Sequence, residues 1–445
     1  MELLIFTISL MLAISILTIE ACRLRFVRDP FFLSLFNLLY LNCYVAAPVL
    51  MALLRGRDLG VWNWIYKHPF PDTIFLYASI ISLVGYFVIL GGYAAWDFPA
   101  SAAKQKHRNR HRVVREDLLL SLAIVTAAVG TAALLVYCNA IGGLGNYLRY
   151  ANAFRGEDPP VVTPWSFLIH IAPFTVISSY IFYGLTLQAK TWGRRLRLRL
   201  ALLATSVISL LVLYHMAGRM LLGTYLLVFI VHHYLYRRHS YLRLLTSVLI
   251  LGGLFIVFGR QLFQLGVAPS SVADRGRLLL NDPAEGVTLT LLEFSFPYPN
   301  LANAVNAVPV EVGYRYFRDV PQALTLLLPK RLLALQMPET VTAINIRQIG
   351  EPIPVDLMSF GYYSLGLPGI LVTCLVFGLT LGLFDRLLPS GGSPVISVLR
   401  VAWLLFLSFR VMYGDPWNTL KSGFALIVCT LIVLAWSRQP RGTPH

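Results

Sequence analysis

Apolar stretches of about twenty residues recur along almost the whole chain. An α-helix needs about twenty apolar residues to cross the hydrocarbon core of a bilayer, which is about 30 Å thick. The 445 residues are 57% hydrophobic and only 13% charged, a balance that is unusual for a soluble protein of this length. The pattern therefore predicts an all-α integral membrane protein.

Eleven such stretches predict eleven transmembrane helices, at 3–21, 31–54, 73–95, 117–138, 166–187, 200–217, 220–236, 243–262, 362–384, 395–413 and 419–436. The first stretch has no basic segment before it and no small-x-small cleavage site, and Arg23, Arg25 and Arg28 follow it. We therefore expect it to be a retained helix and not a signal peptide.

Basic clusters predict the orientation of these helices. The clusters at 23–28, 104–115, 190–199 and 236–243 fall between alternate spans, so all four lie on one side of the membrane. Short cytoplasmic loops are rich in Lys and Arg, which predicts a periplasmic N-terminus and a cytoplasmic C-terminus. We expect three regions: spans 1 to 8 in 1–262, a large periplasmic cap in 263–361, and spans 9 to 11 with a short cytoplasmic tail in 362–445. Short helices are expected at 301–308 and 320–328 of the cap, with prolines at the breaks.

Several classes of function are disfavoured by the composition. The net charge of +16 is spread over many short loops, which fits membrane topology and anionic lipid headgroups better than nucleic acid. The five cysteines show no CxxC or metal-ligand spacing. No Walker or dinucleotide motif is present, and the outer side has no DxD, HExxH or tight carboxylate cluster. We therefore expect no cofactor and no metal.

Arginines on the predicted outer side suggest an anionic ligand, and a lipid diphosphate is the obvious anion at that depth. We predict that Arg219, Arg318 and Arg347 converge under the cap with Arg315 nearby, bind the diphosphate and stabilise it as a leaving group. Arg315 and Arg318 share a face if their segment is helical. Arg410 is a further outer-side charge. The competing interpretation is that these arginines pair with cap carboxylates and hold the cap together; the candidates are Glu311, Asp319 and Glu351.

A general base is needed if a sugar hydroxyl attacks such a lipid. The candidates are Glu293, Glu311, Glu351, Asp356, Asp415, His170 and His215. We favour Glu293 because its apolar context, TLTLLEFSF, raises a carboxyl pKa on burial. His215 is the second choice, one turn before Arg219 near the outer end of its span. Each of these residues can also be an ordinary polar residue with a satisfied partner.

Four segments, taken in order, resemble the O-antigen polymerase (Wzy) family, the oligosaccharide repeat-unit polymerases. They are IGGLGNYL after the fourth span, MAGRMLLGTYLL, LLLPKRLLALQMPE late in the cap, and EPIPVDLMSFGYYSLGLPGILVTCLVFGLTLG. The resemblance covers the chain from about residue 117 to its end. Arg275 and Gly286 give one match to the R-x10-G pattern discussed for polysaccharide polymerases. A mechanism in which two such loops catch and release the glycan needs a second match, and this sequence leaves that second motif missing.

The resemblance implies a glycosyltransferase of the bacterial inner membrane whose active site faces the periplasm. Undecaprenyl-diphosphate-linked repeat units would be joined there without metal, on a fold similar to metal-independent GT-C-type enzymes, with a Wzz-like chain-length regulator as a partner. One alternative is an O-antigen ligase, which transfers the polysaccharide to the lipid A core. An alternative of another class is a transporter of lipid-linked oligosaccharides. Such flippases usually have twelve or more spans and two similar halves, without a single large outer cap.

Overall fold

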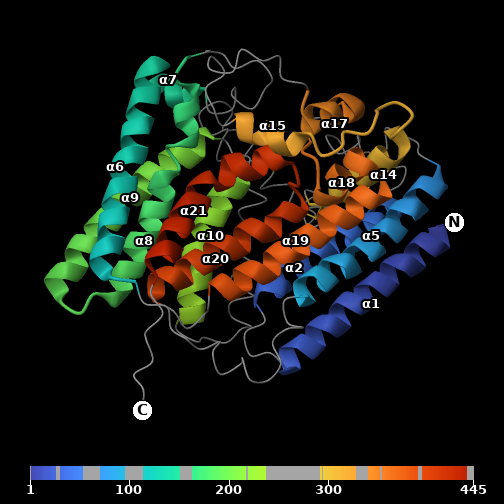
Figure 1. Cartoon of the computed structure of the whole chain (residues 1–445), viewed down its shortest axis with the longest axis horizontal. Helices are drawn as coiled ribbons and strands as arrows, with labels where there is room; N and C mark the ends of the chain where they lie inside the picture. Colours follow the sequence, from blue (N-terminus) through green and yellow to red (C-terminus); the bar gives the residue numbers. More distant parts are fainter. Residues whose placement is uncertain are drawn as a thin grey trace, which may run out of the picture.

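The computed structural model describes the chain at 2–26, 31–53, 71–95, 114–150, 163–216, 219–236, 291–292, 294–326, 339–350, 353–388 and 393–437. These residues form helices and the turns between them, and no strand occurs among them. Figure 1 shows long helices side by side in a bundle, with several short helices gathered at one end. The predicted all-α class is therefore confirmed.

Nine of the described helical segments are long and apolar enough to cross a membrane: Glu2–Cys22, Leu33–Met51, Asp72–Ala95, Glu116–Ala140, Ser166–Gln188, Trp192–His215, Leu367–Leu387, Pro394–Val411 and Pro416–Trp436. The predicted span at 220–236 is helix α10, Arg219–Tyr236, whose apolar part is shorter. The predicted span at 243–262 lies outside the described residues. The chain is a multi-pass membrane protein, and the total of eleven spans stays a prediction.

One span differs from the hydropathy prediction in its internal structure, and another differs in where it begins. The second span is made of α2 (Phe31–Leu41), the π-helical segment η1 (Asn42–Ala46) and α3 (Ala47–Leu53). Helix α9 (Trp192–His215) begins well before residue 200, so the basic cluster there is helical and not a loop. The early start of α9 arises because hydropathy marks the apolar part of a helix, whereas its hydrogen bonds continue into polar flanking residues.

The predicted ninth span is two helices. Helix α18 (Leu357–Leu365) ends at Gly366, whose φ of +64° breaks the helical path, and α19 (Leu367–Leu387) follows at once. Glycine has no Cβ and enters this region of φ without steric cost. The membrane-spanning part therefore starts at 367 and not at 362, and α18 packs beneath the short helices of the cap.

Glycines bring α5 (Asp72–Ala94) and α19 into close contact. A Cβ on Gly378 of α19 would lie 2.1 Å from the carbonyl oxygen of Ile89 in α5, and one on Gly92 would lie 2.6 Å from the carbonyl oxygen of Leu375. Small residues allow such approach between helices in membranes, where packing replaces the hydrophobic effect as the force that joins helices.

The short helices α14 (Pro297–Ala307), α15 (Asp319–Leu326) and α17 (Val341–Ile349) lie together at one end of the bundle, here called the cap end (Figure 1). The helices expected at 301–308 and 320–328 are thereby confirmed. Tyr298 of α14 lies 2.9 Å from the hydroxyl of Ser79 and donates to the carbonyl of Phe75, near the start of α5. These contacts hold the short helices on the bundle and place the polar residues described next.

Candidate functional site

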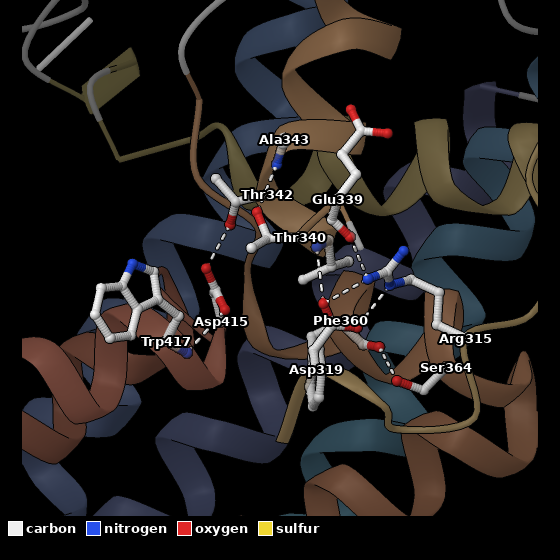
Figure 2. Close-up of polar contacts among 11 residues, drawn as sticks. Arg315, Asp319, Glu339, Thr340, Thr342, Ala343, Phe360, Ser364, Asp415 and Trp417 are labelled. Carbon is white, nitrogen blue, oxygen red and sulfur yellow. Dashed lines mark hydrogen bonds and ion pairs between the residues drawn. The ribbon is translucent and has the colours of Figure 1, made fainter. Parts of the chain in front are cut away.

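A buried ion pair holds the start of α15 against the start of α17 (Figure 2). Arg315 donates from Nε and Nη2 to the two carboxylate oxygens of Asp319, at 2.6 and 2.7 Å, and both side chains are almost fully buried. Arg315 Nη2 also donates to the carbonyl of Glu339, and Asp319 accepts the backbone N–H of Val341. The charge of Arg315 is therefore neutralised within the cap, as the competing interpretation of the sequence expects.

The two other cap arginines that the structure describes are exposed. Arg347 of α17 pairs with the Glu339 carboxylate at 2.7 Å, and Arg318 is exposed just before α15. Residues 314–318 are not helical, and Tyr316 and Phe317 have positive φ values of 51° and 56°. Arg315 and Arg318 therefore do not share a face, because the chain reverses between them. Arg315 and Arg347 do come together, since both contact Glu339.

His215 lies in a separate aromatic cluster formed by α6 (Glu116–Ala140), α7 (Leu144–Arg149) and α9. Its Nδ1 donates to the carbonyl of Tyr147 at 2.7 Å, its Nε2 lies 3.3 Å from the Tyr137 hydroxyl, and its ring stacks on Tyr147 at 3.9 Å. Because both ring nitrogens have partners, these contacts favour a packing role, and the assignment of His215 as a base stays a prediction.

The side-chain contacts of two other predicted site residues lie outside what the structure describes. Arg219 begins α10, but its side chain lies outside what the structure describes, and so does Glu293 as a whole. Their assignments to the diphosphate and to base catalysis stay predictions.

A second junction at the cap end joins α17 to the start of α21 (Pro416–Trp436). Asp415 accepts hydrogen bonds from the Thr342 hydroxyl at 2.8 Å and from the backbone N–H of Trp417 at 3.0 Å (Figure 2). It also accepts one from the Asn418 amide at 3.2 Å. Burial raises the pKa of Asp415, and the hydrogen bonds from Thr342 and Trp417 only partly oppose this. A carboxyl with a raised pKa can accept and hold a proton closer to neutral pH.

Arg410 is buried beside this carboxyl, in the short 3-10 helix η6 (Phe409–Val411) that ends the α20 (Pro394–Ser408) span. Its Nε donates to the carbonyl of Phe406 at 3.3 Å and its Nη1 to the Ser422 hydroxyl at 3.4 Å. The guanidinium lies over the Phe406 ring at 4.6 Å. Within the described part of the chain, no carboxylate forms an ion pair with it. Arg410 is thus a buried cation that has no ion-pair partner among the described residues, although the nearby carboxyl of Asp415 favours its charged form.

Lys421 adds a second cation one turn into α21. Its ammonium lies 6.0 Å from the centre of the Trp417 ring, and it neighbours Ser422, the residue that Arg410 reaches. His170, at the end of the 3-10 segment Ser166–His170, meets the same Trp417 ring edge-on at 5.5 Å. The starts of two spans and the end of a third therefore contribute to one neighbourhood, which we call the candidate site: Arg410, Asp415, Lys421 and His170.

Charged side chains inside a membrane protein are costly and usually mark a functional position. Among these residues, the sequence already singles out Arg410 as an outer-side charge and Asp415 and His170 as candidate bases, but Lys421 is missed. A signal was present: FRVMYGDPWNTLKSGF carries three charges between two apolar stretches. The arrangement suits an anion held by two cations beside a proton acceptor.

Within the described residues, no three or more His, Cys, Asp or Glu side chains are grouped to hold a metal ion. The expectation that neither metal nor cofactor is needed stays a prediction. In the comparisons with known proteins, no family model, no curated protein and no solved structure matches the chain. The resemblance to repeat-unit polymerases therefore rests on the four sequence segments.

Proposed function

We propose that this protein is a polysaccharide polymerase that joins undecaprenyl-diphosphate-linked repeat units at the periplasmic face of the bacterial inner membrane. The observation that carries the proposal is the pair of cations Arg410 and Lys421 near the cap end of a membrane bundle. Arg410 is only 4% exposed and has no ion-pair partner among the described residues. A multi-pass protein that keeps such charge at the edge of its spans offers a site to an anion that is itself anchored in the lipid.

A lipid diphosphate matches this site in charge and in depth. Guanidinium donors bind phosphate oxygens in pairs, and the ammonium of Lys421 adds a point charge. The Coulomb interactions of a buried charge such as Arg410 are strong because solvent screens them little. The leaving diphosphate gains charge as its bond to the sugar breaks, so fixed cations stabilise the transition state more than the bound substrate.

Asp415 is the described carboxyl best placed to accept the proton. In the proposed reaction the hydroxyl oxygen of the acceptor sugar forms a bond to the anomeric carbon of the donor chain. The bond from that carbon to the diphosphate breaks, and its electron pair stays on the diphosphate. The hydroxyl proton passes to Asp415, whose raised pKa suits this role. Glu293, outside the described residues, remains the alternative base.

The link from Asp415 to Thr342 connects this chemistry to the cap. Thr342 lies on α17, which also carries Arg347 and whose first residue, Val341, donates its backbone N–H to the Asp319 carboxylate. Movement of α17 would therefore change the hydrogen bonding of the proposed base. A site that forms between a bundle and its cap can admit two lipid-linked substrates and then exclude water.

The proposal is tested by incubating the purified protein in nanodiscs with lipid-linked repeat units and separating the released glycans by length. A ladder of multiples of the unit is expected, with and without chelator, and Asp415→Asn should stop it. Product that forms only when lipid A core is added would instead show a ligase. Movement of the lipid-linked unit across vesicles without a ladder would show a transporter, and either result would contradict the polymerase.

A further inference from the structure

Four tyrosines lie near one another at the cap end: Tyr77 of α5, Tyr314 and Tyr316 before α15, and Tyr362 of α18. Tyr316 is 70% exposed, and Tyr77 and Tyr314 are each 38% exposed. The rings of Tyr314 and Tyr316 meet at 6.3 Å and 63°. Burial, with the nearby phenols of Tyr77 and Tyr314, raises the pKa of Tyr362 to about 12. We call these four residues the tyrosine patch.

The backbone that presents Tyr316 is strained. Tyr316 and Phe317 both have φ near +55°, at 51° and 56°, a region that bulky residues rarely enter. Such strain persists only where the surrounding contacts impose it, and it concentrates at functional positions.

The contacts that impose this strain are present. Arg315 and Tyr316 donate their backbone N–H groups to the carbonyls of Tyr363 and Ser364, at 3.0 and 2.9 Å. The side chain of Arg315 is fixed by its buried ion pair, and the Phe317 ring packs edge-on against Phe360 at 5.8 Å. The turn is thereby held from both sides, with Phe317 directed into the protein and Tyr316 directed out of it.

The exposed surface here differs from that of the spans. Beyond Trp192, which begins α9, the exposed large hydrophobic side chains of α6 and α9 are aliphatic, such as Leu135 and Leu203 at 63% each, as expected where lipid chains surround the protein. Tyrosine offers a flat apolar face and a hydroxyl at its rim. Sugar rings have the complementary form, with C–H groups on one face and hydroxyls around the edge.

We propose that the tyrosine patch binds sugar rings of the glycan on the lipid-linked substrate. This inference rests on the proposed function, because that function supplies a glycan at the cap end. Tyrosines also anchor proteins at lipid headgroups. A ring needed only for anchoring does not require a strained backbone, however, so the geometry of Tyr316 favours a positioned ligand.

The test uses the full protein and the free oligosaccharide released by mild acid from the lipid-linked glycans of the source cells. Binding is measured by calorimetry and by saturation transfer from protein to sugar protons. Tyr316→Ala is expected to weaken binding about ten-fold, and Tyr316→Phe, which keeps the ring, by far less. Trp192→Ala removes a ring of equal 70% exposure at the start of α9 and should change nothing.

Tyr316→Gly separates binding from folding. Glycine accepts positive φ, so this variant should melt no lower than the wild type while binding the oligosaccharide as weakly as Tyr316→Ala. Unchanged affinity in both variants would overturn the proposal. The proposal would also be overturned if the two variants lost only thermal stability, and only in anionic bilayers. That result would show that Tyr316 anchors the protein at lipid headgroups.

Failure of this inference and failure of the polymerase proposal give different results. A normal glycan ladder, together with oligosaccharide binding that does not depend on Tyr316, would contradict the sugar-binding role of the tyrosine patch and support the polymerase proposal. Oligosaccharide binding that depends on Tyr316, without any ladder from the wild type, would support the sugar-binding role of the patch and contradict the polymerase proposal.

Discussion

Arg315 binds both carboxylate oxygens of Asp319, at 2.6 and 2.7 Å, and the two side chains are only 1% and 3% exposed. The pair joins α15 to α17 through the backbone of Glu339 and Val341. A guanidinium whose charge is matched in this way inside the cap is a poor binder of a second anion. Its position supports a structural role, in contrast to Arg410.

Removing one partner of this pair should destabilise the cap. Arg315→Ala leaves Asp319 buried without its counter-charge, and such losses cost about 3–5 kcal/mol. The unfolding temperature in detergent and the rate of tryptic cleavage in the cap measure the effect. Arg347→Ala is the matched control, since its exposed pair contributes at most about 1 kcal/mol. If Arg315→Ala melts like the wild type but loses substrate binding, Arg315 is a ligand residue after all.

Gly378→Ala should loosen the contact between α5 and α19. The added Cβ would lie 2.1 Å from the carbonyl of Ile89, so the two backbones must separate, at a cost of about 1–3 kcal/mol. Gly91→Ala in α5 is the control, because nothing lies within 4 Å of its Cβ position. Thermal unfolding should separate the two variants clearly. Equal melting temperatures would mean that α5 and α19 are not packed this closely.

Asp356 should make stability depend on pH. Burial raises its pKa from 3.8 to about 6, against hydrogen bonds from Ser359 and Tyr44. Since the folded protein holds this proton more tightly than the unfolded chain, stability falls as pH rises from about 4 to about 6 and then levels off. The loss is about 3 kcal/mol. The melting temperature of the wild type should therefore fall relative to that of Asp356→Asn as pH rises through that window. A difference between them that is constant from pH 4 to 7 would contradict this.

The orientation of the bundle can be tested by labelling two positions of equal exposure. Tyr316→Cys lies at the cap end and Trp192→Cys at the start of α9, each 70% exposed in the native residue. In a background with Cys22 replaced by Ser, a membrane-impermeant maleimide added to intact spheroplasts should label residue 316 and not 192. The reverse labelling pattern would place the cap in the cytoplasm and would contradict the proposal that the site binds periplasmic substrates.

The sequence predicts most of the bundle because hydropathy follows directly from the lipid surroundings. It also predicts α14 and α15, whose apolar residues are bounded by prolines. It does not predict the break at Gly366 or the π-helical segment Asn42–Ala46, since both lie inside continuous apolar stretches. Such details depend on tertiary contacts that no local pattern records.

The candidate site was only partly visible in the sequence. The arginine content of the sequence points to the cap, yet charge alone does not show which cations are already paired. Arg315 and Arg347 prove to be bound to Asp319 and Glu339, and Lys421 passed as an ordinary residue of a span. Pairing is a property of the folded chain, so the distinction between structural and available cations needed the structure.

The most direct test of the account is the affinity of the protein in nanodiscs for undecaprenyl diphosphate without sugar. Native mass spectrometry gives the bound fraction, with uncharged undecaprenol as the control ligand. Arg410→Gln and Lys421→Gln should each weaken diphosphate binding about ten-fold or more without lowering the melting temperature, and should leave undecaprenol binding unchanged. Arg347→Gln, which removes a paired and exposed cation, should bind like the wild type. Normal diphosphate binding by Arg410→Gln and Lys421→Gln would contradict the central claim.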